Sequence, residues 1–269
     1  MSQSKYCNNP IGVFDSGVGG LSVLKQIRSL LPSEYLIYFA DSAHAPYGDK
    51  TTDFIKKRSI KIAKYLITQH NIKSLVVACN TATTEAISDI RQHIDIPVIG
   101  VEPAIKPATA LTKNKSIGIM ATHRTINSTR YSELLIKYAR NTQVHNVICY
   151  ELADIIEKYP CGNSRSLALI KQYTSTLQQN NVDVVVLGCT HYPFLIEQIQ
   201  ATLGKHVAIL ETGKPVAIQV ENILNKHHLV CNINNHGNVE FFSSLDNKNH
   251  KNSIQQLWGK TVSVNLALQ

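Results

Sequence analysis

The sequence lacks the features that mark membrane proteins, secreted disulfide-bonded domains and zinc ribbons. No uninterrupted apolar run approaches the ~20 residues that a membrane-spanning helix needs. The six cysteines form no C-x-x-C pair, which argues against a disulfide framework and against a zinc ribbon. The residues from Met1 to Cys7 have neither the basic start nor the apolar stretch of a secretory signal, so we expect a cytoplasmic protein without membrane contact.

The sequence also lacks a nucleic-acid-binding motif and a complete nucleotide-binding loop. The net charge is +8, but the tight basic run at 56–58 lies in a polar helical stretch, where a solvated helix face is the simpler interpretation. We therefore expect that no nucleic-acid partner is required. The glycine-rich turn at 17–20 fails the dinucleotide pattern because Ser22 occupies the final glycine position, and the segment from Gly48 to Thr51 lacks the upstream glycine of a phosphate-binding loop.

Strand and helix patterns alternate along the whole chain. Such alternation predicts an α/β protein with mostly parallel sheets that helices cover on both faces. Expected strands lie at 11–14, 35–40, 74–78, 96–100, 116–120, 145–149, 182–187, 207–210, 239–242 and 261–266. Expected helices lie at 21–31, 52–69, 83–93, 106–113, 125–138, 151–158, 164–179, 194–203, 215–226 and 252–258.

Two segments repeat the same design. In each, an apolar strand is followed by a small residue, then a cysteine, and then a threonine one or two residues further on. They are LVVACNT at 75–81 and VVVLGCT at 184–190. An earlier echo supports a duplicated unit, because IGVF at 11–14 recurs as IGIM at 117–120. We therefore predict two pseudo-symmetric α/β domains around a central cleft, with one thiol contributed by each half.

Ligands of parallel sheets bind beyond the carboxyl ends of the strands, so the strand-end residues are the natural site candidates. These residues are Asp15, Asp41, Cys79, Thr122 and Cys189. A helix that begins directly after each cysteine is expected to stabilise the thiolate and lower the cysteine pKa. Donors on Asn80, Thr81 and Thr190, together with helix-start amides, could hold a carboxylate.

Two opposed thiols can act on opposite faces of one carbon, one as a thiolate base and the other as a thiol acid. Such a pair inverts a stereocentre and titrates as a coupled pair. We expect two neighbours, Asp15 in the first half and His191 beside Cys189, to set the balance between thiol and thiolate in this pair.

Four motifs in order, FDSGVGGLS at 14–22, PYG at 46–48, CNTA at 79–82 and GCTHYP at 188–193, make the chain resemble the glutamate racemases over nearly its whole length. The resemblance implies that L- and D-glutamate are interconverted to supply D-glutamate for peptidoglycan. It also implies that neither pyridoxal phosphate nor a metal takes part. The implied partner is the small-molecule substrate glutamate, and the oligomeric state is left open, with a homodimer among the alternatives.

The resemblance also assigns roles to residues. Cys79 would take the α-proton of D-glutamate with help from Asp15, and Cys189 that of L-glutamate with help from His191. Glu157 matches a further carboxylate of the family near the second cysteine. The substrate contacts implied by position are Asp15, Ser16, Tyr47, Gly48, Asn80, Thr81, Thr190 and His191.

The family fold implies a first domain of residues 1–100 and 212–269 and a second of residues 101–211. Three positions depart from the usual family pattern. Ala104 and Arg124 stand where glycine is usual, and Glu211-Thr212-Gly213 replaces Asp-Ser-Gly.

Other functions stay open on the residues alone. One is a racemase of aspartate or another acidic amino acid, and another is a non-catalytic protein that binds a partner through its basic surface. A third is a metal hydrolase that uses Cys189 and His191. Individually, each cysteine could be an inert core thiol, Asp15 could cap its turn, and Glu157 could be a solvated helix residue.

Overall fold

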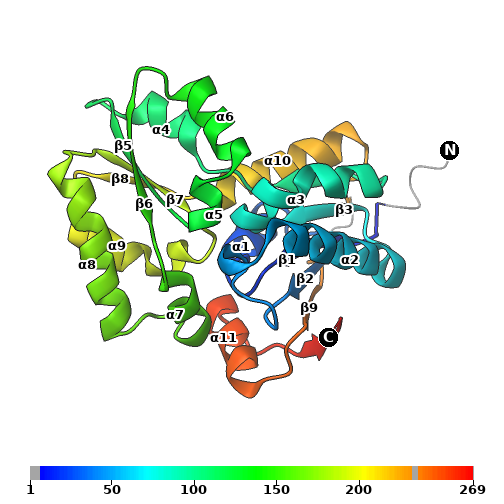
Figure 1. Cartoon of the computed structure of the whole chain (residues 1–269). Coiled ribbons are helices and arrows are strands. Elements are labelled where there is room, and N and C mark those ends of the chain that lie inside the picture. The colour runs from blue at the N-terminus through cyan, green and yellow to red at the C-terminus, as the bar shows by residue number, and fades with distance from the viewer. Residues whose placement is uncertain (1–6, 232–235, 269) are drawn as a thin grey trace.

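The computed structural model describes residues 7–231 and 236–268. Helices and strands alternate through these residues, and the strands form two separate sheets, which Figure 1 shows side by side. The first sheet has the strand order β10-β9-β2-β1-β3-β4 and the second β6-β5-β7-β8, and every described pairing is parallel. The predicted α/β class with mostly parallel sheets is confirmed.

The strands are β1 (Ile11–Asp15), β2 (Leu36–Ala40), β3 (Ser74–Val77), β4 (Val98–Gly100), β5 (Ser116–Ala121), β6 (Gln143–Ile148), β7 (Val184–Gly188), β8 (Ala208–Leu210), β9 (Val239–Ser243) and β10 (Val264–Leu266). The α-helices are α1 (Leu21–Leu30), α2 (Thr52–His70), α3 (Asn80–His93), α4 (Ile105–Leu111), α5 (His123–Ile126), α6 (Thr129–Tyr138), α7 (Leu152–Lys158), α8 (Ser164–Gln179), α9 (Ile196–Leu203), α10 (Gly213–Lys226) and α11 (Lys248–Trp258). Two 3-10 turns, η2 (Tyr47–Asp49) and η3 (Tyr192–Leu195), complete the described elements.

The central strand β1 is buried on both faces because its side chains alternate between two helical layers. Ile11 and Val13 join the core cluster that contains α1 and α10 side chains, whereas Phe14 joins the cluster of α2 and α3. All five residues of β1 are buried, as expected for an inner parallel strand that reads as an unbroken apolar run.

The second sheet is built in the same way around β5. Ile117 and Ile119 pack with α4 and α6 side chains, and Met120 packs with those of α8 on the other face. β5 lies between β6 and β7 just as β1 lies between β2 and β3. Cys79 and Cys189, which follow β3 and β7, therefore occupy equivalent places in the two sheets.

The last part of the chain returns to the first sheet. β9 pairs with β2 and β10 pairs with β9, while α10 packs against α1. The division into residues 1–100 with 212–269 and residues 101–211 stays a prediction.

Several element boundaries differ from the expected ones. The helix expected over 125–138 is two helices, because Ser128 caps α6 by accepting a hydrogen bond from the Tyr131 amide. α3 begins at Asn80, with Cys79 at its N-cap, and α11 begins at Lys248 because the Asn247 side chain caps it. The expectation of a helix directly after Cys189 is wrong, since the 3-10 turn η3 precedes α9.

No helix within the described ranges combines the length and the apolar composition that crossing a bilayer requires.

Candidate active site

Cys79 lies where β3 ends and α3 begins. Its Sγ accepts a hydrogen bond from the Ala82 amide at 3.4 Å, as the N-cap of a helix does. The thiol also lies 3.6 Å from the Ser16 hydroxyl oxygen. The residue is only 5% exposed, so the thiol is nearly enclosed by protein.

Asp15 lies at the end of β1 and reaches toward both cysteine segments. Its Oδ1 accepts from the Gly17 amide at 2.8 Å and lies 3.5 Å from the Ser16 hydroxyl that contacts Cys79. Its Oδ2 accepts from the Thr190 hydroxyl at 3.0 Å. Asp15 is fully buried, and this burial raises its carboxyl pKa to about 6. Asp15 therefore connects with Cys79 through Ser16.

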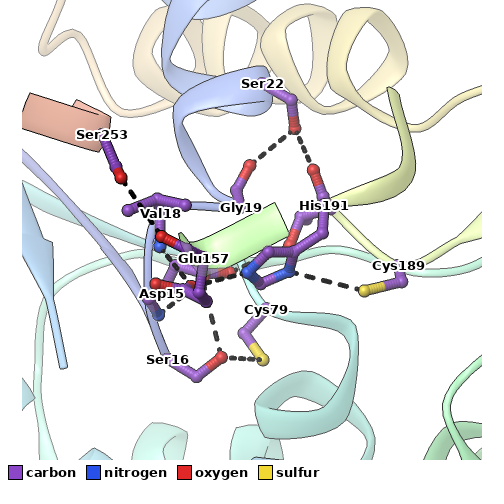
Figure 2. A network of polar contacts seen from close by, with 12 residues as sticks. Asp15, Ser16, Val18, Gly19, Ser22, Cys79, Glu157, Cys189, His191 and Ser253 are labelled. Carbon is purple, nitrogen blue, oxygen red and sulfur yellow. Dashed lines mark hydrogen bonds and ion pairs between the residues drawn. The ribbon is translucent and has the colours of Figure 1, made fainter. Parts of the chain in front are cut away.

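Cys189 is the first member of a thiol, imidazole and carboxylate chain, which we call the relay (Figure 2). Cys189 Sγ lies 3.6 Å from Nδ1 of His191, and Nε2 of His191 lies 2.6 Å from Oε1 of Glu157. Glu157 comes from α7, and His191 from the turn after β7. A nucleophile or base that is hydrogen-bonded to an imidazole, itself oriented by a carboxylate, is the arrangement of a catalytic triad.

The contacts within the relay favour the charged forms of His191 and Glu157. Burial alone would lower the pKa of His191, but its contacts with Cys189 and Glu157 raise that pKa well above the ordinary range. Burial alone would raise the pKa of Glu157, but its contacts with His191 lower it. The relay thus favours a protonated imidazole beside the thiol, which is the charge that stabilises a thiolate.

The electrostatics of Cys79 differ from expectation. Burial, followed by the negative charge of Asp15, raises the pKa of the Cys79 thiol to about 12. The Ala82 amide acts in the opposite direction but does not compensate. The expectation that the helix start lowers this pKa is wrong for the substrate-free site, because desolvation of the thiolate outweighs one backbone hydrogen bond. The charge of a Cys189 thiolate would also raise the pKa of Cys79, as the smallest of these causes.

The predicted anion-binding residues Asn80, Thr81 and Thr190 follow the two cysteines along the chain and are buried. Thr81 Oγ1 lies 3.0 Å from Thr122 Oγ1, which joins the start of α3 to the end of β5. Both side-chain polar atoms of Asn80 are buried without a hydrogen-bond partner among the described residues. Because buried amides are normally satisfied, these two atoms make Asn80 a candidate contact for a polar ligand, and its role in binding stays a prediction.

Tyr47 and Gly48, also predicted as substrate contacts, make other contacts in the structure. The Tyr47 hydroxyl donates to Asp41 at 2.6 Å, and Arg58 binds the same carboxylate at 2.6 and 2.9 Å. Asp41 is therefore held in a buried ion pair. Gly48 lies against Thr122, to which an added Cβ would be 3.5 Å away.

Two of the departures from the family pattern have visible contacts. Arg124 Nη1 donates to the hydroxyl of Thr52 at 3.2 Å, which ties α5 to the start of α2. Glu211 Oε2 accepts a hydrogen bond from the Gly213 amide at 2.6 Å. The aspartate that is usual at this position could accept the same bond through its shorter side chain. Nothing in the structure explains the choice of Ala104.

Sequence reasoning missed the Val18 amide, which donates to Glu157 Oε1 at 2.7 Å, and the Ser253 hydroxyl, which lies 3.2 Å from the Glu157 carbonyl oxygen. The glycine-rich turn around Val18 was a usable signal, because glycine next to a strand end often marks a close backbone approach. No local signal marks Ser253, which lies 96 residues from Glu157.

The protein is a parallel α/β protein with one cysteine thiol at each of two equivalent strand ends, and each thiol has a polar neighbour. Residues 11–219 match the Asp/Glu/hydantoin racemase family, and the chain belongs to that family. It is 40% identical to the glutamate racemase of Pseudomonas putida, over 95% of this chain and 96% of that protein. The glutamate racemase of Clostridium novyi is 41% identical over 88% of this chain and 92% of its own length.

Solved structures agree with the sequence comparison. Escherichia coli glutamate racemase, in complex with L-glutamate and the activator UDP-MurNAc-ala, matches with a TM-score of 0.85 at 32% identity over 96% of this chain and 98% of that one. Glutamate racemase from Francisella tularensis in complex with D-glutamate also gives a TM-score of 0.85, at 29% identity over 98% of each chain. The resemblance to glutamate racemases is confirmed.

Proposed function

We propose that the protein interconverts L- and D-glutamate by moving a proton at Cα between the thiols of Cys79 and Cys189. The reaction would use neither pyridoxal phosphate nor a metal, and it would supply D-glutamate for peptidoglycan. The observation that carries the proposal is the equivalent position of the two cysteines after β3 and β7, each with its own polar support. The similarity to glutamate racemases at about 40% identity supports the substrate.

In the direction from L- to D-glutamate, the Cys189 thiolate takes the α-proton and becomes a thiol. The electron pair of the broken C–H bond moves into the α-carboxylate, and the Cys79 thiol then donates its proton to the opposite face of Cα. The reverse direction begins with a Cys79 thiolate and a Cys189 thiol. Each turnover therefore exchanges the protonation states of the two sulfurs.

The charges of the substrate fit the surroundings of the thiols. Amide and hydroxyl groups of Asn80, Thr81 and Thr190 can donate to the carboxylates, because anions are held by such donors and by helix starts. The substrate ammonium can face Asp15 and the Cys79 thiolate. A positive charge next to Cys79 lowers its pKa from about 12, so the proton transfer becomes accessible only when the substrate is bound.

The test is racemisation of L-glutamate in deuterated water. We expect D-glutamate that carries deuterium at Cα, because its new proton comes from a thiol that exchanges with solvent. Cys79→Ser and Cys189→Ser should each lose turnover while remaining folded. Cys161→Ser is the matched control, since Cys161 is exposed, and it should keep full activity. Turnover without deuterium at Cα, or normal activity in either active-site variant, would contradict the proposal.

Aspartate or another acidic amino acid is the alternative substrate. Aspartate racemase from Picrophilus torridus is only 14% identical, which supports a shared fold alone. Side-by-side turnover of glutamate and aspartate decides between them. Unchanged activity after treatment with a chelator would exclude the metal-hydrolase alternative. Cytoplasmic location stays a prediction, and the oligomeric state stays open, with a homodimer among the alternatives.

A further inference from the structure

The relay of Cys189 is completed by backbone from the first sheet. Glu157 and His191 come from α7 and the β7 turn, whereas the Val18 amide comes from the loop that joins β1 to α1. One oxygen of Glu157 accepts both from Val18, at 2.7 Å, and from His191, at 2.6 Å. We call residues 17–20 the clamp loop, and Figure 2 shows Val18 and Gly19 of this loop beside the relay.

Two glycines of the clamp loop leave the space that the relay occupies. A Cβ at Gly17 would lie 1.7 Å from Oε1 of Glu157, and one at Gly19 would lie 2.4 Å from Nδ1 of His191. Neither glycine has a left-handed φ, so any residue could adopt the same backbone conformation. Glycine is required here because a side chain would displace the relay.

The clamp loop is also fixed against the β7 turn. Ser22 Oγ lies within hydrogen-bond distance of the Gly19 carbonyl, at 2.9 Å, and of the Thr190 carbonyl, at 2.8 Å. The Thr190 hydroxyl donates to Asp15 at the start of the loop. By contrast, the polar neighbour of Cys79, the Ser16 hydroxyl, comes from the same sheet as Cys79 itself.

We propose that the clamp loop is a positioning element for Cys189. Through the Val18 amide and the space at Gly17 and Gly19, it holds Glu157 and His191 in the arrangement that lets Cys189 accept and donate a proton. The proposal rests on the two-thiol racemase function above. It implies that the proton transfers at Cys189 depend on contact between the two sheets.

Gly17→Ala and Gly19→Ala test this proposal. Misplacement of catalytic groups by about 1 Å costs on the order of 10²-fold in rate, and we expect kcat/KM to fall by about that factor. The fall must be equal in the two directions because the enantiomers have equal free energies. The direction-specific readout is the primary isotope effect with glutamate that carries deuterium at Cα.

The isotope effects should diverge in these variants. L-glutamate loses its deuteron to Cys189, so slowing Cys189 makes this step rate-limiting and raises the isotope effect. D-glutamate loses its deuteron to Cys79, after which protonation by Cys189 becomes limiting, so its isotope effect falls toward the equilibrium isotope effect of the first transfer. Gly12→Ala is the matched control, since its Cβ would meet the core side chain of Ile72 at 2.8 Å. It should alter stability while leaving both isotope effects unchanged.

Each outcome separates this inference from the proposed function. If the unaltered protein does not racemise glutamate, the proposed function fails. If it does, but both clamp-loop variants show unchanged isotope effects, the positioning role alone is overturned. Where Gly17→Ala and Gly19→Ala do not fold, Glu157→Asp draws the carboxylate back from both the Val18 amide and His191 without adding a methyl group. Unchanged isotope effects in that variant would likewise overturn the proposal.

Discussion

Replacing Asp15 by Asn should stabilise the folded protein at neutral pH while removing its activity. Asp15 is fully buried, and its pKa rises from 3.8 to about 6 chiefly because burial penalises the charged form. A shift of one pKa unit corresponds to about 1.4 kcal/mol. The shift from 3.8 to about 6 therefore means that ionised Asp15 lowers the free energy of unfolding by about 3 kcal/mol. Asparagine has the same shape, can still accept from the Gly17 amide, and carries no charge.

The sign follows from proton binding. Between pH 3.8 and about 6 the folded protein holds the Asp15 proton more tightly than the unfolded chain does. The stability that this proton contributes is fully present below pH 3.8 and is lost as the pH rises through about 6. Asp15→Asn should therefore gain up to about 3 kcal/mol at pH 7 and little at pH 3.8.

Urea unfolding of both proteins between pH 4 and pH 8, with racemase activity measured alongside, provides the assay. The difference in unfolding free energy should grow across the interval from pH 4 to 6 and stay constant above it. The activity should be lost because the variant lacks the charge that faces the substrate ammonium. A variant that is less stable at pH 7, or a difference that does not change with pH, would refute the reasoning.

Three further predictions follow from individual contacts. Glu157→Gln should lower kcat/KM by roughly 10-fold, because it replaces a charge-assisted contact to His191, worth about 1.5–3 kcal/mol, by a neutral one worth about 0.5–1.5 kcal/mol; rates in both directions check this, and an unchanged kcat/KM would contradict it. Arg58→Met should destabilise the fold by about 3 kcal/mol, because it removes the arginine partner of the buried Asp41 charge and leaves the contacts of Tyr47 and His44; urea unfolding measures the loss, and a variant of normal stability would argue against a buried charge. Asn80→Ala should raise KM with little change in stability, since the amide has no described partner to lose; titration with glutamate and a melting curve check both parts, and a normal KM would exclude Asn80 from substrate binding.

The sequence by itself determined the parallel α/β class and the strand-end location of both cysteines. These features are local, because an unbroken apolar run followed by a helical pattern reports a buried parallel strand and its crossover helix. The echo between 11–14 and 117–120 likewise indicated a duplicated unit, and these segments form β1 and β5, which hold equivalent places in the two sheets. Resemblance to the family supplied Glu157, for which nothing in the neighbouring residues argues.

Only the tertiary structure decided how the thiols are supported. Glu157 lies 34 residues from His191 and 139 from Val18, and no spacing rule connects positions so far apart. The direction of the Cys79 pKa also depended on burial by the whole fold, which outweighs the helix start that the sequence displays. Strand and helix patterns are written in neighbouring residues, whereas hydrogen bonds and desolvation in the site depend on which distant segments pack together.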